Sequence, residues 1–478
     1  MNHFQENRLS AEDFGYPDDK RLPFANRIHL PVPASQPHTS DLLMKKGGEF
    51  ESEMAFVRKI IEPGDHFVDI GAGYGAYTWA AAAEVGAGGS VWVFEPETTA
   101  AAYLSRTISM NQLKQVQLIQ AGMLGRKRIA LINIRTAARH SDADEAERED
   151  NFEDKGLIGL DDAMGDFSWS EIGFVRIGAE IPKENILKGG MSFLSAHSPL
   201  IMLETKHGQS FHSELIHAFK SLGYDSYHLI PGIGCLAPIR VVNGGDQIYS
   251  NVFLCKLDCA ARLEAKNLLI YRKIDAGSGV KTAPNLWIDY TRKYPYAIRL
   301  LQLWNQYIQS NESNLHWRLH QEALSSYAIS WMTQLPAPDR FQALKWAYQL
   351  LDDMVQKNPT FSRLMSLVRV ASDMGYRERA DIVLSRLIKM METGDNVSVD
   401  EPFLAISSHF EQIDPGQEIG NWCLVSLLET YEQNQFFSAH AEADISLGNL
   451  ELLKTLPFYN PEMEQRRKSI RERFGLQE

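Results

Sequence analysis

One segment near the start of the chain constrains the fold more than any other. It reads FVDIGAGYGAY over residues 67–77, and VWVFEPE follows over residues 91–97. The pattern is typical of an apolar strand, a turn with glycine at alternate positions, a helix, and a second strand that ends in Glu95. Glycines let the backbone pass close to a bulky ligand, and an acidic side chain about 20 residues further on can accept bonds from both ribose hydroxyls. The segment therefore predicts a site for a nucleoside-bearing cofactor in an α/β domain.

The glycine spacing separates two kinds of cofactor. A dinucleotide-binding turn has the pattern G-x-G-x-x-G, whereas the glycines in this chain are spaced G-x-G-x-G. Asp69 lies two residues before the first glycine, where a carboxylate would repel a pyrophosphate and attract a ligand with a free amino group. We therefore expect S-adenosylmethionine, and an ordinary strand-to-helix turn is the alternative. The expected cofactor-binding residues are Asp69, Gly71, Gly73, Tyr74, Gly75 and Glu95.

Composition limits the functional classes. The 478 residues suggest two or three domains, and the net charge of -13 argues against nucleic acid as the main ligand. The four cysteines are too few for a disulfide framework, and Cys255 and Cys259 lack a second pair with which to hold zinc, so no metal is expected. His316 and His320 share a helical face without the glutamate of a zinc motif and predict a surface helix. The polar N-terminus and the lack of a long apolar run predict a cytoplasmic protein without a membrane span.

The pattern of apolar residues divides the chain into four regions. Residues 1–48 are predicted to form an extended arm on a neighbouring surface or a partner chain. Residues 49–260 alternate strands with helices, which indicates a Rossmann-like, doubly wound, largely parallel sheet. Residues 261–290 are typical of a loop-rich connector. Residues 291–478 predict an all-α domain, whose helix pairs suit either tetratricopeptide-like repeats or a plain bundle.

The expected strands of the second region place the site residues at one edge of the sheet. Ligands in such sheets lie at the carboxyl ends of strands, so the glycine turn and Glu95 share that edge with the residues after Ile177 and Leu203. A run dense in charge over residues 140–155 is expected to be a solvated loop. The expected strands are residues 67–70, 91–94, 116–120, 129–134, 171–177, 200–204, 226–230 and 252–257.

Several short motifs between residues 51 and 257 recur together in one known family. They are Pro63-Gly64-Asp65, the glycine turn from Asp69 to Tyr77, Phe94-Glu95-Pro96, Leu160-Asp161-Asp162 and the strand Leu200–Glu204. These motifs resemble the FkbM-type S-adenosylmethionine-dependent methyltransferases, over less than half of the chain. The resemblance implies a methyltransferase that modifies an oxygen of a sugar or another secondary metabolite, and thus a small-molecule or glycan acceptor.

One segment departs from that family's pattern. Where the family has Lys-Ile-Asp-x-Glu-Gly-x-Glu, this chain has RIGAEIPK over residues 176–183. Arg176 stands for the lysine and Gly178 for the aspartate, and Glu180 is the acid that is kept. The resemblance implies that the missing aspartate faces the reacting centre. The alternative function is therefore a methyltransferase-fold scaffold without turnover, whose helical domain docks a protein partner or a second copy of the chain.

Methyl transfer to an oxygen needs close approach of donor and acceptor, and it gains from a general base. Glu204 ends a strand at the expected site and His207 follows in the next loop, so either could accept a proton. Glu180 could orient an acceptor. The plainer alternatives are a loop-holding role for Glu204, a solvent-facing position for His207, and pairing with Arg176 for Glu180. In falling order of preference, the expected catalytic residues are Glu204, His207 and Glu180.

Overall fold

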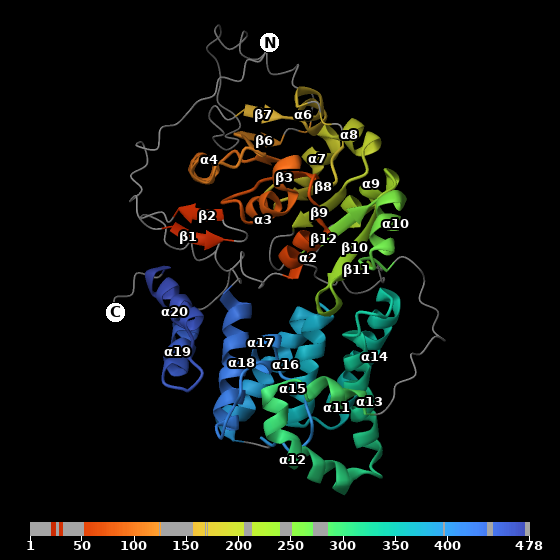
Figure 1. The fold of residues 1–478 in the computed structure, drawn as a ribbon, viewed down its shortest axis with the longest axis vertical. Helices are drawn as coiled ribbons and strands as arrows, with labels where there is room; N and C mark the ends of the chain where they lie inside the picture. Colours follow the sequence, from red (N-terminus) through yellow and green to blue (C-terminus); the bar gives the residue numbers. More distant parts are fainter. Residues whose placement is uncertain are drawn as a thin grey trace, which may run out of the picture. The chain divides into compact units, whose positions relative to one another are not determined.

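The structure is a computed structural model, and it divides into two compact units. Unit 1 comprises Met1–Leu229 and Pro238–Ala265, and unit 2 comprises Ile230–Ala237 and Lys266–Glu478. Figure 1 colours the chain from red at the N-terminus to blue at the C-terminus, so the two units can be followed by colour. The residues that the structure describes are 21–24, 28–31, 52–123, 125, 156–167, 169, 171–204, 213–239, 251–270, 285–394, 397–436 and 443–473.

The main sheet has eight strands in the order β11-β10-β12-β9-β8-β3-β4-β5. Strands β9, β8, β3, β4 and β5 pair in parallel, whereas β12 is antiparallel to both of its neighbours. The predicted fold class, a largely parallel doubly wound α/β sheet with an all-α C-terminal region, is confirmed. The strands are β3 (His66–Ile70), β4 (Ser90–Phe94), β5 (Val116–Ile119), β8 (Phe174–Ile177), β9 (Leu200–Glu204), β10 (Asp225–Ile230), β11 (Cys235–Pro238) and β12 (Asn251–Cys255).

The strand order shows where a ligand can bind. Numbered along the chain, the parallel strands β5, β4, β3, β8 and β9 run 3-2-1-4-5. A dinucleotide-binding sheet continues with a sixth strand beside the fifth, but antiparallel β12 lies there instead. The order reverses between β3 and β8, and such sheets bind ligands at the carboxyl ends of the strands that flank the reversal. The carboxyl ends of β3 and β8 therefore define the candidate site.

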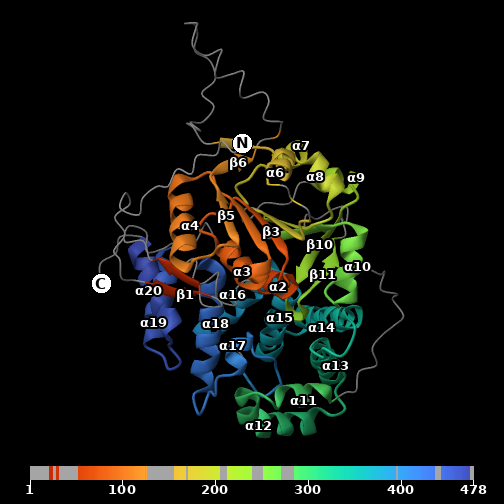
Figure 2. The same ribbon diagram turned by 45° about the horizontal axis from the view of Figure 1, so that its top comes forward.

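Helices connect the strands of unit 1, and their ends follow from local sequence. Helix α3 lies between Gly75 and Gly86, whose φ values of 86° and 63° suit glycine. Helix α4 is capped by Glu97, whose carboxylate accepts hydrogen bonds from Thr99 N and Ala100 N. Figure 2 shows α4 beside β5. The helices are α2 (Ser52–Ile60), α3 (Ala76–Val85), α4 (Thr98–Asn111), α6 (Leu160–Asp166), α7 (Lys183–Gly189), α8 (Met191–Ala196), α9 (Ser213–Ser221) and α10 (Leu257–Ala265), with a 3-10 turn η3 (Gly86–Gly88).

Two small sheets were not anticipated. Part of the expected N-terminal arm is an antiparallel hairpin of β1 (Arg21–Phe24) and β2 (Ile28–Pro31). The Asn111 side chain at the end of α4 bonds both backbone groups of His29, which fixes β2 against that helix. A parallel pair joins β6 (Ala121–Met123) to β7 (Gly156–Ile158). The strand expected over residues 129–134 and the acidic loop expected over 140–155 lie outside the described residues.

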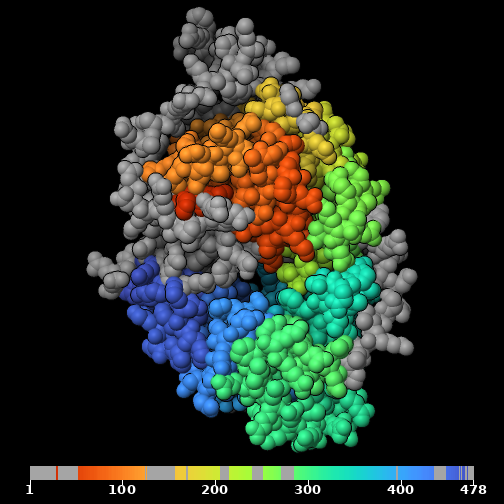
Figure 3. All heavy atoms as spheres, in the orientation of Figure 1, coloured from red at the N-terminus to blue at the C-terminus, as the bar shows by residue number. Residues whose placement is uncertain are grey.

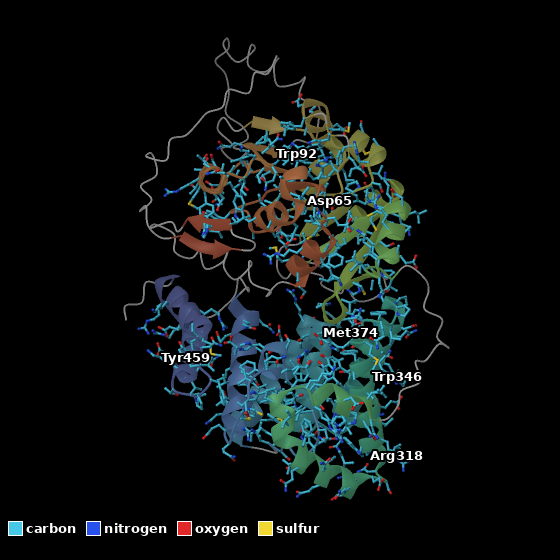
Figure 4. All side chains as sticks on the ribbon, viewed as in Figure 1. Asp65, Trp92, Arg318, Trp346, Met374 and Tyr459 are labelled. Carbon is cyan, nitrogen blue, oxygen red and sulfur yellow. The ribbon has the colours of Figure 1, made fainter. Side chains whose placement is uncertain are left out.

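Unit 2 is helical and has its own core. From α13 to α16, each helix packs against the next in sequence. The side chains of Trp304, Trp317 and Trp422 are buried in the core, as is Met374, which Figure 4 labels. Figure 3 shows the atoms of these helices in green, teal and blue. The helices are α11 (Leu286–Thr291), α12 (Pro295–Asn311), α13 (Leu315–Ser330), α14 (Ala337–Lys357), α15 (Phe361–Asp373), α16 (Arg377–Thr393), α17 (Ser408–Glu411), α18 (Ile419–Phe436), α19 (Ala443–Lys454) and α20 (Pro461–Arg473), with a 3-10 turn η4 (Pro231–Ile233).

The structure corrects the prediction for one histidine of unit 2. His320, which was expected on a surface helix, is fully buried, whereas His316 on the same helix is exposed. The His320 ring can be buried because its Nδ1 lies 2.9 Å from Glu401 Oε1.

Among the described residues, no helix combines the length and the apolar character that crossing a membrane requires.

Candidate functional site

The glycine turn after β3 leaves one stretch of backbone open. Gly71, Gly73 and Gly75 have φ values of 71°, 55° and 86°, which favour glycine. A Cβ at Gly71 would lie 2.7 Å from Ile181 Cγ1, and one at Gly75 would lie 2.6 Å from Leu104 Cδ2. At Gly73, no heavy atom of the described residues lies within 4 Å of the Cβ position. The middle of the turn is therefore where a ligand could come closest to the backbone.

Glu95, at the carboxyl end of β4, reaches this open stretch. Its Oε2 accepts a hydrogen bond from Gly73 N at 2.7 Å, and its Oε1 accepts one from Glu97 N at 2.8 Å. Burial raises the pKa of Glu95, although the same two backbone bonds act in the opposite direction. A carboxylate has about four acceptor positions, so two remain for a pair of ribose hydroxyls. These residues fit the nucleoside half of the expected cofactor.

Two tyrosines near the turn have different surroundings. The half-buried Tyr74 packs edge-on against Tyr103 with ring centroids 5.3 Å apart, and its carbonyl accepts a bond from Trp79 Nε1 at 3.0 Å. Tyr77 is 2% exposed, and its ring centroid lies 5.1 Å from the guanidinium carbon of Arg176. Tyr74 thus lies at the candidate site, whereas Tyr77 belongs to the core beneath it.

A buried arginine joins three neighbouring strands at their carboxyl ends. Arg176 on β8 donates from Nη1 to Asp69 Oδ1 and to Gly71 O, both at 2.8 Å, and from Nη2 to Glu204 Oε2 at 2.5 Å. Its side chain therefore spans the reversal of strand order between β3 and β8. Burial lowers the pKa of Arg176, but the charges of Glu204 and Asp69 outweigh it and hold that pKa well above the usual value. The guanidinium is a permanent internal cation.

The carboxylate of Asp69 is already occupied. In addition to the Arg176 bond at Oδ1, its Oδ2 accepts a hydrogen bond from Thr78 Oγ1 at 2.6 Å, and the residue has no exposed surface. Its negative charge is therefore paired with a cation inside the fold, and a contact of Asp69 with a ligand's amino group stays a prediction. Sequence reasoning missed both partners. The available signal was a basic residue within an otherwise apolar strand, whose parallel register places Arg176 beside Asp69.

The predicted catalytic residues occupy different positions. Glu204 ends β9, its side chain is 15% exposed, and it is ion-paired with Arg176. Glu180 is exposed in the turn that follows β8. His207 lies outside the described residues. Within the part of the chain that the structure describes, no three His, Cys, Asp or Glu side chains are arranged to hold a metal ion.

Gly178 is glycine for a packing reason. Its N–H donates to Ile70 O at 2.8 Å, which brings the end of β8 against the glycine turn. A Cβ at Gly178 would lie 2.7 Å from Gly71 O, closer than real Cβ atoms approach an oxygen. The aspartate that the resembling family has here could therefore not be accommodated without moving the turn.

Comparison with known proteins gives matches only among solved structures. No family model and no curated protein matches this chain. The chain is similar to an rRNA methylase from Streptococcus thermophilus, at 14% identity over 43% of this chain and 94% of that one, with a TM-score of 0.25. It is also similar to a SAM dependent methyltransferase from Aquifex aeolicus, at 12% identity over 45% and 95% of the two chains, with a TM-score of 0.23. Likenesses at this level identify neither an activity nor a substrate, so function has to be argued from the site.

Proposed function

We propose that unit 1 binds S-adenosylmethionine and transfers its methyl group to an oxygen of a small-molecule or glycan acceptor. The observation that carries the proposal is the position of Glu95, which is held by Gly73 N and Glu97 N with acceptor capacity to spare. The G-x-G-x-G spacing and the antiparallel strand β12 both favour this cofactor over a dinucleotide.

The residues of this chain have separate tasks in the proposed reaction. Glu95 holds the ribose, and the open backbone at Gly73 lets the nucleoside approach. The bound cofactor supplies the methyl group, and the protein contributes close approach and orientation of the acceptor oxygen. Glu204, His207 and Glu180 remain, in that order, the proposed groups that accept a proton from the acceptor or orient it. The sugar-like nature of the acceptor comes from the family resemblance.

The variant Glu95→Gln tests cofactor binding. A glutamine keeps the shape but loses the charge, and a hydrogen bond to a charged group contributes about 1.5–3 kcal/mol. Isothermal titration with S-adenosylmethionine should show a loss of affinity of that size. Glu97→Gln is the matched control, since the carboxylate of Glu97 caps α4 and the substitution keeps the backbone N–H that bonds Glu95. Unchanged affinity in a folded Glu95→Gln protein would remove the proposal.

Turnover needs its own test. Methyl transfer from labelled cofactor should be followed over a panel of sugar and hydroxylated metabolite acceptors. Glu204→Gln should lower turnover and leave cofactor affinity nearly intact, as expected of a group that acts on the transition state. Full turnover in both Glu204→Gln and Glu180→Gln would remove these two assignments.

Two observations favour a second candidate function, a binding protein without turnover. The carboxylate of Glu204 is engaged by Arg176, and Gly178 has no room for an acidic side chain. In this case the helical region docks a protein partner or a second copy of the chain. Cofactor binding without release of S-adenosylhomocysteine, together with a stable complex in light scattering, would favour this alternative.

A further inference from the structure

The two halves of the expected cofactor meet different surroundings in unit 1. The nucleoside half has Glu95, with two acceptor positions to spare, and the open backbone at Gly73. The amino-acid half carries an ammonium group, and the acceptor expected for it is Asp69. The Asp69 side chain has no exposed surface that a ligand could contact, and its two oxygens are engaged inside the fold by Arg176 and Thr78. The neighbouring Gly71 carbonyl accepts a hydrogen bond from the same guanidinium. The fold thus fits one half of the cofactor and not the other.

Arg176 is held too firmly to give way to a ligand. It is 6% exposed and bonds two carboxylates and a carbonyl through a planar group whose donors are fixed in direction. A ligand ammonium that displaced it from Asp69 would exchange one ion pair for another and leave the guanidinium buried without that partner. Because one ion pair is lost for each one formed, the exchange would not increase the number of ion pairs.

The charge of the cluster still tolerates a positive sulfur. Asp69 and Glu204 each carry one negative charge and Arg176 carries one positive charge, so the three side chains together have a formal charge of minus one. A sulfonium near the carboxyl ends of β3 and β8 would therefore not be repelled. The cluster therefore disfavours the ligand's ammonium group and not its sulfonium group.

We propose that Arg176 is a specificity-determining residue that takes the place of the ligand's ammonium group, so that unit 1 selects its ligand by adenosine and not by the amino-acid end. The inference rests on the proposed function, because the Glu95 site must first bind adenosine. The class of ligand is then adenosine thioethers and sulfonium compounds, with the amino group contributing nothing to affinity.

Two thioethers isolate the ammonium group. 5′-Methylthioadenosine has a methyl group on sulfur, and S-adenosyl-3-thiopropylamine has an aminopropyl group there with no carboxylate. Isothermal titration of the full-length protein should give dissociation constants that differ by less than tenfold. Tighter binding of the amine by tenfold or more, about the contribution of one charge-assisted bond, would overturn the inference and leave the proposed function standing. Absence of binding by both compounds would remove the proposed function as well, so the two failures are distinguishable.

A double variant tests the position directly. Arg176→Met with Glu204→Gln removes the internal cation together with one carboxylate, and leaves Asp69 to receive a ligand ammonium. In this variant the amine should gain at least tenfold over 5′-methylthioadenosine relative to the wild type. Glu204→Gln alone is the control, since it keeps the pair of Arg176 with Asp69 and should show no gain. A smaller gain in a folded double variant would overturn the inference, and if that variant fails to fold, the wild-type comparison decides.

Discussion

Two buried arginine clusters, one in each unit, share their chemistry and differ in their surroundings. In unit 1, Arg176 bonds carboxylates from two neighbouring strands and also the carbonyl of Gly71 in the glycine turn. In unit 2, Arg363 on α15 donates from Nε and Nη2 to Glu401 Oε1 at 2.9 and 2.8 Å. Both arginines are almost fully buried. The unit 1 cluster adjoins backbone at the carboxyl ends of parallel strands, where ligands bind.

The partners of Glu401 in unit 2 are side chains of the helical core. Thr360 Oγ1 donates to Glu401 Oε2 at 2.6 Å, and the His320 ring lies against Oε1. Burial alone would raise the pKa of Glu401, but the charges of His320 and Arg363 outweigh it and hold that pKa at about 2. The comparison teaches that a buried ion pair does not by itself mark a ligand site. What distinguishes the unit 1 cluster is its position beside open backbone.

Breaking the unit 2 cluster should have the largest effect on stability. Arg363→Met leaves the Glu401 carboxylate buried without its arginine, and such a loss costs about 3–5 kcal/mol. Denaturant unfolding should show this decrease in the free energy of unfolding, while adenosine binding by the folded protein stays unchanged. The control is Arg299→Met, because Arg299 and Asp414 form a pair with side chains 49% and 48% exposed. Exposed pairs contribute about 0–1 kcal/mol, so equal losses in the two variants would contradict the structural role of the cluster.

Adding one carbon beside the unit 1 cluster should have a smaller effect on stability and a clear effect on binding. Gly178→Ala places a Cβ 2.7 Å from Gly71 O, and overpacking of this kind costs about 1–3 kcal/mol. The glycine turn must shift, so affinity for 5′-methylthioadenosine should fall. Gly173→Ala, whose Cβ would lie 3.8 Å from His66 O, should change neither quantity. Normal binding and stability in Gly178→Ala would show that the turn is not constrained by β8.

The pH dependence of the affinity for S-adenosylmethionine tests whether the Glu95 carboxylate holds the ribose. Because burial raises its pKa, this carboxyl group takes up a proton at a higher pH than an exposed glutamate. Ribose hydroxyls donate to the charged form, so affinity should fall as pH decreases through the raised pKa, by at most about tenfold per pH unit. Isothermal titration at decreasing pH measures this fall. The same decline in Glu95→Gln would assign it to another group.

A histidine on β10 should make the free energy of unfolding depend on pH, and this is the smallest effect that we expect. Burial lowers the pKa of His228 from 6.5 to about 4. The unfolded chain therefore takes up this proton at a higher pH than the folded protein, and the free energy of unfolding should fall as pH decreases from 6.5 towards 4. Because His228 as a whole is half-buried, solvent screening reduces the effect, and we expect a fall of about 1–2 kcal/mol.

Urea unfolding across this pH range should show a shallower dependence of the free energy of unfolding on pH for His228→Gln than for the wild type. An identical slope in the wild type and His228→Gln would mean that other groups set the acid sensitivity of unit 1.

The sequence by itself determined the local elements around the site. Apolar runs and alternate glycines predicted β3 and β4 to within one residue at each end, with a helix between them, because strand period and turn conformation depend on neighbouring residues. The same pattern predicted Glu95 at the end of a strand, and in the structure its Oε2 accepts a hydrogen bond from Gly73 N. Whether the site binds S-adenosylmethionine remains a prediction from these residues.

Only the tertiary structure decided which charges meet. Arg176 and Asp69 are 107 positions apart, and His320 and Glu401 are 81 positions apart. A charge in an apolar strand or helix is unfavourable until the register of a neighbouring element brings it a partner, and no local pattern encodes that register. For this reason the sequence predicted His320 as a surface residue, whereas packing buries it beside Glu401. Local pattern likewise did not show that Arg176 pairs with Asp69. The need for glycine at position 178 also depends on the tertiary structure, because the Gly71 carbonyl that a Cβ would meet lies in a turn far away in the sequence.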